Sequence, residues 1–69
     1  MQTTTLNITG MSCEKCVQFV TQALKNVPGV REAEVSLTEN NAVVKHQDAE
    51  TAALVAAVEE EGYGAEQAL

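Results

Sequence analysis

The two cysteines of this chain stand three positions apart, at Cys13 and Cys16. Two thiols at this spacing can hold one metal ion together, or can form and break a disulfide with each other. Thiolates are soft ligands that suit Cu(I), Zn(II) and similar cations. A disulfide kept only for stability is disfavoured, because bridging residues three apart closes almost no loop. The chemistry to expect is therefore metal binding or redox exchange.

The cysteines lie between a predicted strand and a predicted helix. Before them, Thr4, Leu6 and Ile8 alternate with Thr5, Asn7 and Thr9, which is the period of a strand. After them, residues on one helical face recur as Cys16, Val17, Val20, Ala23, Leu24 and Val27, and Pro28-Gly29 ends the helix. Cys16 thus falls in the first helical turn, where free amide N–H groups and the helix dipole lower the pKa of a thiol.

The second half of the chain predicts two more strands, a helix and a short last strand. The strands are residues 32–37 and 42–46, joined by a turn at 39–41 where Asn tolerates left-handed backbone. Asp48 or Thr51 is expected to cap the helix, whose inner side carries Leu54, Ala57, Val58 and Glu61, and which Gly62 ends. Ala65, Gln67 and Leu69 alternate as the last strand.

The order β-α-β-β-α-β predicts an α+β fold in one domain, residues 1–69. Right-handed crossovers then give a ferredoxin-like sandwich, with a four-stranded antiparallel sheet and both helices on one face. This topology places Met11 and Tyr63 beside the cysteines and carries His46 to the opposite end of the molecule.

Composition excludes several classes of function. Ten acidic residues stand against four basic ones, which argues against a nucleic-acid binder or a protein that binds an anionic membrane. No apolar run is long enough to insert in a membrane, and residues 1–5 do not read as a secretory signal, so a cytoplasmic protein is expected. No catalytic base, nucleophile triad or phosphate loop is evident, so we do not expect an enzyme.

The run Gly10-Met11-Ser12-Cys13-Glu14-Lys15-Cys16 resembles the G-M-x-C-x-x-C motif of heavy-metal-associated domains. The resemblance extends to Val27-Pro28-Gly29-Val30, Val35-Ser36-Leu37 and Glu60-Glu61-Gly62-Tyr63. It implies a copper chaperone, or a metal-binding module of a P-type copper ATPase, in which Cys13 and Cys16 hold the ion and Met11 packs beneath the loop. Tyr63 is similar to the tyrosine near the site of bacterial copper chaperones. Phe19 departs from the family pattern, which more often has a small residue there.

The leading hypothesis is a cytoplasmic metallochaperone that carries Cu(I) between Cys13 and Cys16. Cu(I) accepts two or three sulfurs, whereas a structural zinc site takes four ligands. Transfer would proceed by sulfur exchange to the metal-binding domain of a copper-transporting P-type ATPase. The apo protein is expected to be a monomer, with a metal-bridged dimer as an alternative. The run 59–61 is either a solvated acidic face or a docking surface for a basic partner, and an exposed Phe19 would be a partner contact.

Other hypotheses remain open on the sequence alone. The same scaffold could bind Hg(II) or Zn(II), or be a regulatory domain excised from a metal-transporting ATPase. A thiol-disulfide oxidoreductase also uses two cysteines at a helix start, although usually in a longer fold. His46 is either a structural residue that ends a strand or a ligand to metal bound by a neighbouring molecule.

Overall fold

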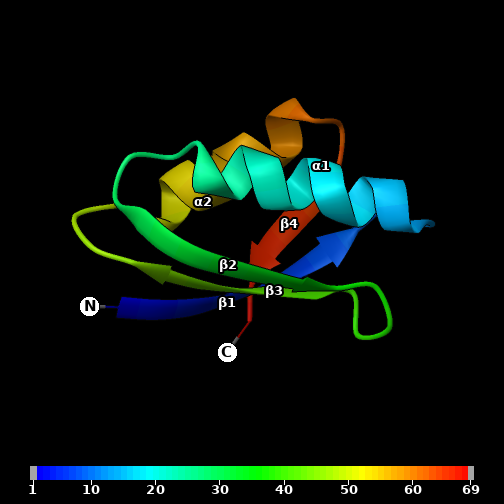
Figure 1. Cartoon of the computed structure of the whole chain (residues 1–69), viewed down its shortest axis with the longest axis horizontal. Coiled ribbons are helices and arrows are strands. Elements are labelled where there is room, and N and C mark those ends of the chain that lie inside the picture. Colours follow the sequence, from blue (N-terminus) through cyan, green and yellow to red (C-terminus); the bar gives the residue numbers. More distant parts are fainter. Residues whose placement is uncertain (1, 69) are drawn as a thin grey trace.

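The computed structural model describes residues 2–68 and confirms the predicted order of strands and helices (Figure 1). The elements are β1 (Gln2–Thr9), α1 (Glu14–Lys25), β2 (Val30–Ser36), β3 (Asn41–His46), α2 (Thr51–Glu60) and β4 (Gly64–Gln67). The strands form one antiparallel sheet in the order β2-β3-β1-β4, and both helices cover the same face of it. The fold is the expected ferredoxin-like α+β sandwich.

The core lies between the sheet and the helices. The apolar residues that recur along the strands and along the helices point into it. The strands contribute every second residue and the helices contribute one stripe. The buried cluster consists of Leu6, Ile8, Met11, Val20, Leu24, Ala42, Val44, Leu54 and Val58. The core is thus one layer of apolar side chains between the sheet and the two helices.

The helix ends differ from the sequence predictions. Helix α1 ends at Lys25 with Asn26 as its C-cap, so Val27 lies beyond the helix and packs against the core from the following turn. The predicted N-cap of α2 was wrong. Glu50 occupies that position with extended backbone and no side-chain cap, while Thr51 is already helical and Asp48 takes φ 61° in the preceding loop.

The last strand pairs with β1 at the edge of the sheet. Ile8 faces Ala65 and Leu6 faces Gln67 in antiparallel register. The alternation predicted for this strand included Leu69, which lies outside the described residues. Gly62 has φ 93° and directs the chain from the end of α2 into β4, which supports the helix stop predicted there.

The loops of the sandwich gather at its two ends. We call one the thiol end: it contains the loop 10–13, the turn 37–40 and the turn 61–63. The other, the opposite end, contains the turn 26–29 and the loop 47–50, which a hydrogen bond from Gln47 N–H to the carbonyl of Gly29 holds together at 2.8 Å. In Figure 1 the start of α1 and the turn between β2 and β3 lie at the same side, away from the loop before α2. No helix within residues 2–68 is both long enough and apolar enough to cross a bilayer.

Candidate metal centre

The cysteine loop begins at Gly10, where the chain leaves β1. Gly10 has φ +96°, a conformation that side chains disfavour, and a Cβ placed there would already touch the ring of Tyr63 at 3.4 Å. The backbone therefore turns sharply and passes close beneath the aromatic ring. Cys13 follows as the extended N-cap residue of α1, and Cys16 is the third residue of the helix. The carbonyl of Cys13 accepts the N–H of Cys16 at 3.1 Å, which fixes both backbones.

The two sulfur atoms converge at the surface. Cys13 Sγ and Cys16 Sγ are 3.4 Å apart, close enough for a thiol–thiolate hydrogen bond. Both residues are reduced; Cys13 is exposed and Cys16 is half-buried. Two sulfurs that are adjacent, reduced and accessible to solvent can share one ion without rearrangement of the fold.

The surroundings favour the thiolate form of Cys16. A hydrogen bond from the backbone of Ser12, then one from the Tyr63 side chain and one from Cys13, lower the pKa of Cys16 from 9.0 to about 6. Hydrogen bonds to a charged group stabilise that charge. The sequence predicted a lowered pKa from the helix start, but the largest cause is the loop backbone at Ser12. A donor of this kind cannot be recognised in the sequence, because it depends on how the loop turns.

Tyr63 lies beside the sulfurs, as the topology predicted. Its hydrogen bond to Cys16, with smaller contributions from burial and nearby negative charge, raises the pKa of Tyr63 to about 12. The hydroxyl therefore stays protonated at neutral pH and donates its hydrogen to sulfur. Tyr63 also packs against the core, so its ring has a fixed position.

Met11 is a core residue, as predicted for the Met of the loop. Only 8% of it is exposed, and it belongs to the buried cluster that includes Ile8 and Val20. Its unbranched side chain is of the kind that fills irregular gaps in a core. The loop is thus tied to the core through Met11, and it comes close to the ring of Tyr63 at Gly10.

His46 lies at the opposite end and is fully engaged there. It is 1% exposed, with Nδ1 2.9 Å from the carbonyl oxygen of Ala49 and Nε2 2.7 Å from Oγ1 of Thr4. A carbonyl can only accept, so Nδ1 carries a proton, and in the neutral tautomer of this kind Nε2 accepts from the Thr4 hydroxyl. Both nitrogens are occupied by the protein itself, and this supports the structural interpretation of His46.

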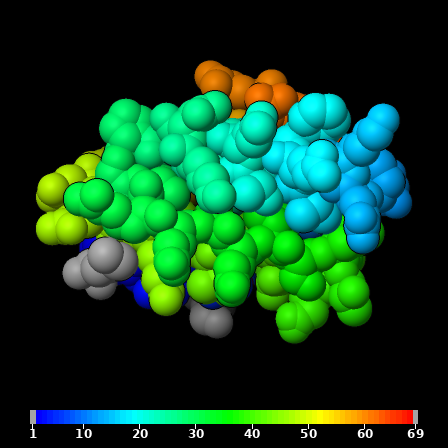
Figure 2. Space-filling model, viewed as in Figure 1, coloured from blue at the N-terminus to red at the C-terminus, as the bar shows by residue number. Residues whose placement is uncertain are grey.

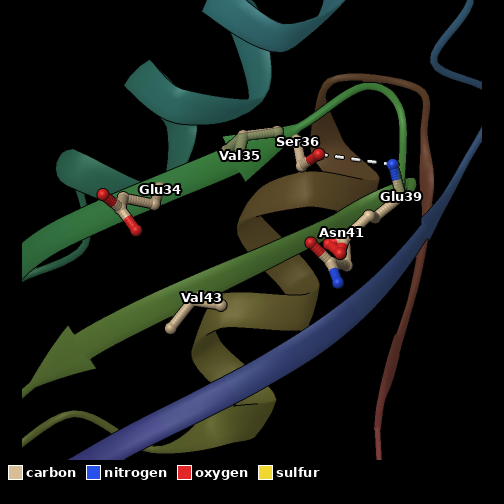
Figure 3. Close-up of a pocket in the computed structure, with 6 residues that line it drawn as sticks. All are labelled: Glu34, Val35, Ser36, Glu39, Asn41 and Val43. Carbon is tan, nitrogen blue, oxygen red and sulfur yellow. Dashed lines mark hydrogen bonds between the residues drawn. The ribbon is translucent and has the colours of Figure 1, made fainter.

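The part of the chain that the structure describes offers no larger set of metal donors than the thiol pair. Within residues 2–68, no group of three or more His, Cys, Asp or Glu side chains is arranged to hold an ion. A hollow of about 330 Å³ on β2 and β3, shown in Figure 3, offers different chemistry. It is lined by Glu34, Val35, Ser36, Glu39, Asn41 and Val43, and in it the Ser36 hydroxyl accepts the N–H of Glu39 at 3.2 Å. With neither thiol nor imidazole, this hollow is not a competing site for a soft metal.

The sequence and fold match known metal-handling proteins. The pattern of the heavy-metal-associated domain matches residues 5–64. The chain is 45% identical over 65 residues to a copper-exporting P-type ATPase of Vibrio cholerae and 47% identical over 62 residues to a mercuric reductase of Acidithiobacillus ferrooxidans. These alignments cover 94% and 88% of this chain but only 7% and 11% of those proteins. The copper chaperone CopZ of Staphylococcus aureus is 40% identical over 60 residues, covering 84% of this chain and 88% of CopZ.

Solved structures agree with these matches. A copper binding domain from the P-type ATPase HMA7 superposes with a TM-score of 0.97 at 32% identity, covering 100% of this chain and 96% of that one. Oxidized MerP from Ralstonia metallidurans CH34 gives a TM-score of 0.94 at 31% identity, covering 99% and 97%. The same scaffold therefore occurs in proteins named for copper and in proteins named for mercury.

Proposed function

Since this chain belongs to the heavy-metal-associated domain family, we propose that it is a metallochaperone that binds Cu(I) through Cys13 and Cys16. It passes the ion by ligand exchange to the metal-binding domain of a copper-transporting P-type ATPase. The observation that carries this proposal is the accessible pair of sulfurs, 3.4 Å apart and without a third donor group among residues 2–68.

The donor set favours an ion that is satisfied by two sulfurs. Cu(I) is soft and accepts such a pair, whereas a structural Zn(II) site takes four ligands. Taking the zinc–sulfur bond length of about 2.3 Å as a guide for Cu(I), a linear S–Cu–S unit needs sulfurs about 4.6 Å apart. The pair must therefore open by about 1 Å, and this movement is assigned to Cys13, which is exposed and precedes the helix.

Transfer breaks one copper–sulfur bond for each bond that it forms. An acceptor thiolate adds to the ion to give three sulfur ligands, and one donor sulfur then leaves as a thiolate. The second acceptor thiolate displaces the remaining donor sulfur in the same way. Copper stays Cu(I) throughout, and protons released by acceptor thiols are taken up by solvent or by the departing cysteines. The two-sulfur site leaves room for the incoming ligand.

Met11 and Tyr63 support the site without binding the ion. Met11 holds the loop from the core side, and Tyr63 donates a hydrogen bond to Cys16. That hydrogen bond keeps Cys16 ready as a thiolate and fixes its direction, so that Cys13 remains the more mobile sulfur.

In this proposal residues 1–69 form one domain that carries an ion and catalyses no reaction. It works in the cytoplasm, where thiols are kept reduced, and the apo protein is a monomer. A metal-bridged dimer would form only if the thiol pairs of two copies share an ion. A domain within a larger copper ATPase is the closest alternative, and the 45% identity to the Vibrio cholerae ATPase favours it.

Mercury binding is a second candidate function, favoured by the similarity to mercuric reductase and to oxidized MerP. Hg(II) is also soft and suits a thiolate pair, so the site geometry does not discriminate against it. Competition between Cu(I), Hg(II) and Zn(II) for the apo protein separates these functions.

The proposal is tested by anaerobic titration of the reduced protein with Cu(I). One ion per chain is expected to bind, with an ultraviolet band from charge transfer between sulfur and copper. Cys13→Ser and Cys16→Ser should each abolish this binding, while His46→Asn, at the opposite end, should retain it. Tight one-to-one binding in both serine variants would contradict the assignment.

A further inference from the structure

One large apolar side chain is exposed among residues 2–68, and it stands next to the metal site. Phe19 is 52% exposed on α1, three residues after Cys16. Residues three apart on a helix have Cβ atoms about 5–6 Å apart. Aromatic side chains on a helix also lean toward its N-terminus, so the ring of Phe19 covers the turn that carries Cys16.

A separate apolar groove lies farther along the same helix. Ala23, four residues after Phe19 on the same face of α1, lines this groove between the two helices. The groove has a volume of about 350 Å³, and α2 contributes Ala53, Ala56 and Ala57 to it. In Figure 2, α1 lies across the front of the molecule, with the turn that follows α2 in orange above it. Phe19 is thus the exposed large apolar side chain of residues 2–68, and the groove that begins at Ala23 is lined further by Asn26, Val27 and Pro28, toward the opposite end.

A protein that receives copper must cover this surface. Its sulfur has to come within bonding distance of the ion. At that distance the residues around Cys13 and Cys16 face the partner directly. Phe19, one helical turn from Cys16, then lies within the contact. An aromatic residue near the centre of an interface is the type that most often dominates its affinity.

The charges around the site define the partner. Five carboxylates lie in the thiol end or in the helix turns that adjoin it, namely Glu14, Glu39, Glu59, Glu60 and Glu61, against the single cation Lys15. Lys25, Arg31 and Lys45 lie toward the opposite end, where Lys45 pairs with Glu32 at 3.4 Å. Cu(I) held by two thiolates adds a further negative charge. A partner with an acidic surface would be repelled, whereas one rich in Lys or Arg would be attracted.

The carboxylates at the end of α2 destabilise that helix. Carboxylates stabilise the start of a helix and destabilise its end. Helix α1 follows the favourable pattern, with Glu14 in its first turn and Lys25 in its last. Helix α2 has the reverse pattern: Glu59 and Glu60 end it and Glu61 is its C-cap, with no basic residue in its last turn. Local violations of this kind are expected where a surface serves function.

We propose that Phe19 and the carboxylates 59–61 form a docking face for one kind of partner, a thiol-bearing acceptor protein whose metal site is ringed by Lys or Arg around an apolar contact. The inference rests on the proposed Cu(I) transfer and adds the chemistry by which the acceptor is recognised. Phe19 supplies apolar contact area, and the carboxylates supply long-range attraction and orientation.

Two charge-altered copies of this chain serve as acceptor probes. The first carries Glu59→Lys, Glu60→Lys and Glu61→Lys at the thiol end. The second carries Glu32→Lys, Glu34→Lys and Glu50→Lys, on β2 and before α2, outside the proposed docking face. Both change the net charge by +6, from −6 to 0, so only the position of the charge differs. The ¹⁵N-labelled, Cu(I)-loaded wild-type chain is titrated with each apo acceptor, and chemical shifts report the apparent affinity.

The first acceptor is expected to bind about tenfold more tightly than the second at low salt. High salt should remove this difference by screening. Phe19→Ala in the donor should lower the affinity for the first acceptor by about tenfold. Gln18→Ala, an exposed neighbour that faces the groove on the β2 side of α1, should change the affinity by no more than about twofold.

Three results would overturn the docking face. They are equal affinity for the two acceptors, an unchanged affinity after Phe19→Ala, or equally tight association between two wild-type copies, which would assign the face to self-association. Each donor is first titrated with Cu(I) alone. Intact Cu(I) binding with any of these results refutes only the docking face, whereas failure of the wild-type chain to bind Cu(I) removes the proposed function and the docking face together.

Discussion

Each end of this molecule holds side chains of a type that binds metals in other proteins. They are accessible at the thiol end and buried at the opposite end. At the thiol end Cys13 and Cys16 reach the surface, and their sulfurs contact each other at 3.4 Å. At the opposite end His46 is buried, and both of its nitrogens are hydrogen-bonded within the protein. A ligand that is already satisfied contributes to stability, whereas one left accessible is available to bind an ion. Burial and local partners therefore decide which side chains are available to bind an ion, and residue type alone does not.

The largest expected effect separates metal binding from folding at the thiol end. Replacing both cysteines with serine should abolish Cu(I) binding, because oxygen is a hard and poor ligand for this soft ion. At pH 6 or below, where the Cys16 thiolate adds little stability, the free energy of unfolding of the apo protein should change little, since Cys13 is exposed and Cys16 is half-buried. Calorimetric titration with Cu(I), alongside urea unfolding of the same variant, checks both parts. If the double serine variant lost its stability but still bound Cu(I), the cysteines would be structural residues and not the metal ligands.

The corresponding change at the opposite end should do the reverse. Thr4→Val keeps the shape of the side chain and removes the hydroxyl that donates to His46 Nε2. A buried acceptor left without its donor costs about 1–3 kcal/mol, so the free energy of unfolding should fall by that amount. Cu(I) affinity and stoichiometry should stay unchanged. Urea unfolding measures the loss, and a stability equal to wild type would show that this hydrogen bond contributes nothing.

A smaller effect is expected from Tyr63→Phe, which removes a hydrogen bond to Cys16 and keeps the ring. The pKa of Cys16, about 6 in the wild-type protein, should rise toward its ordinary value. At pH values below the pKa, each unit by which the pKa of Cys16 rises lowers its thiolate fraction about tenfold. The rate of alkylation of Cys16 as a function of pH, compared between Cys13→Ser and Cys13→Ser/Tyr63→Phe proteins, measures this shift. An unchanged profile would remove Tyr63 from the account of the site.

The smallest effect concerns the stability of the apo protein as pH changes. The pKa of Cys16 is about 6 in the folded chain and near 9.0 when unfolded. Between these values the unfolded state binds more protons, so stability rises with pH across this window and is lost as pH falls through 6. Thermal unfolding of wild type and Cys16→Ser at several pH values tests this. The serine variant should lack the rise; if both curves are parallel, Cys16 is not ionised as described.

The sequence predicts the framework well because burial repeats with the period of each element. Thr4, Leu6 and Ile8 all point inward from β1, and Gly62 ends the second helix as expected. The same topology correctly places Tyr63 beside the thiols and His46 away from them. These features depend on local pattern and on chain direction, both of which can be read along the sequence.

Contacts between distant residues and loop conformations were not predictable in the same way. The hydrogen bond between Thr4 and His46 joins positions 42 residues apart, and nothing in either local pattern indicates it. The backbone of Ser12 donates to Cys16 only because of how the loop after Gly10 turns. The cap of α2 was predicted from side-chain preference, but Glu50 takes that position without a side-chain hydrogen bond.

The central claim is that two sulfurs, and no other side chain of this molecule, hold one soft ion. X-ray absorption at the copper edge of the Cu(I)-loaded protein tests it most directly. The account predicts two sulfur neighbours per copper and no nitrogen neighbour, in wild type and in His46→Asn alike. A nitrogen neighbour that disappears in His46→Asn, or four sulfurs around each ion, would contradict it.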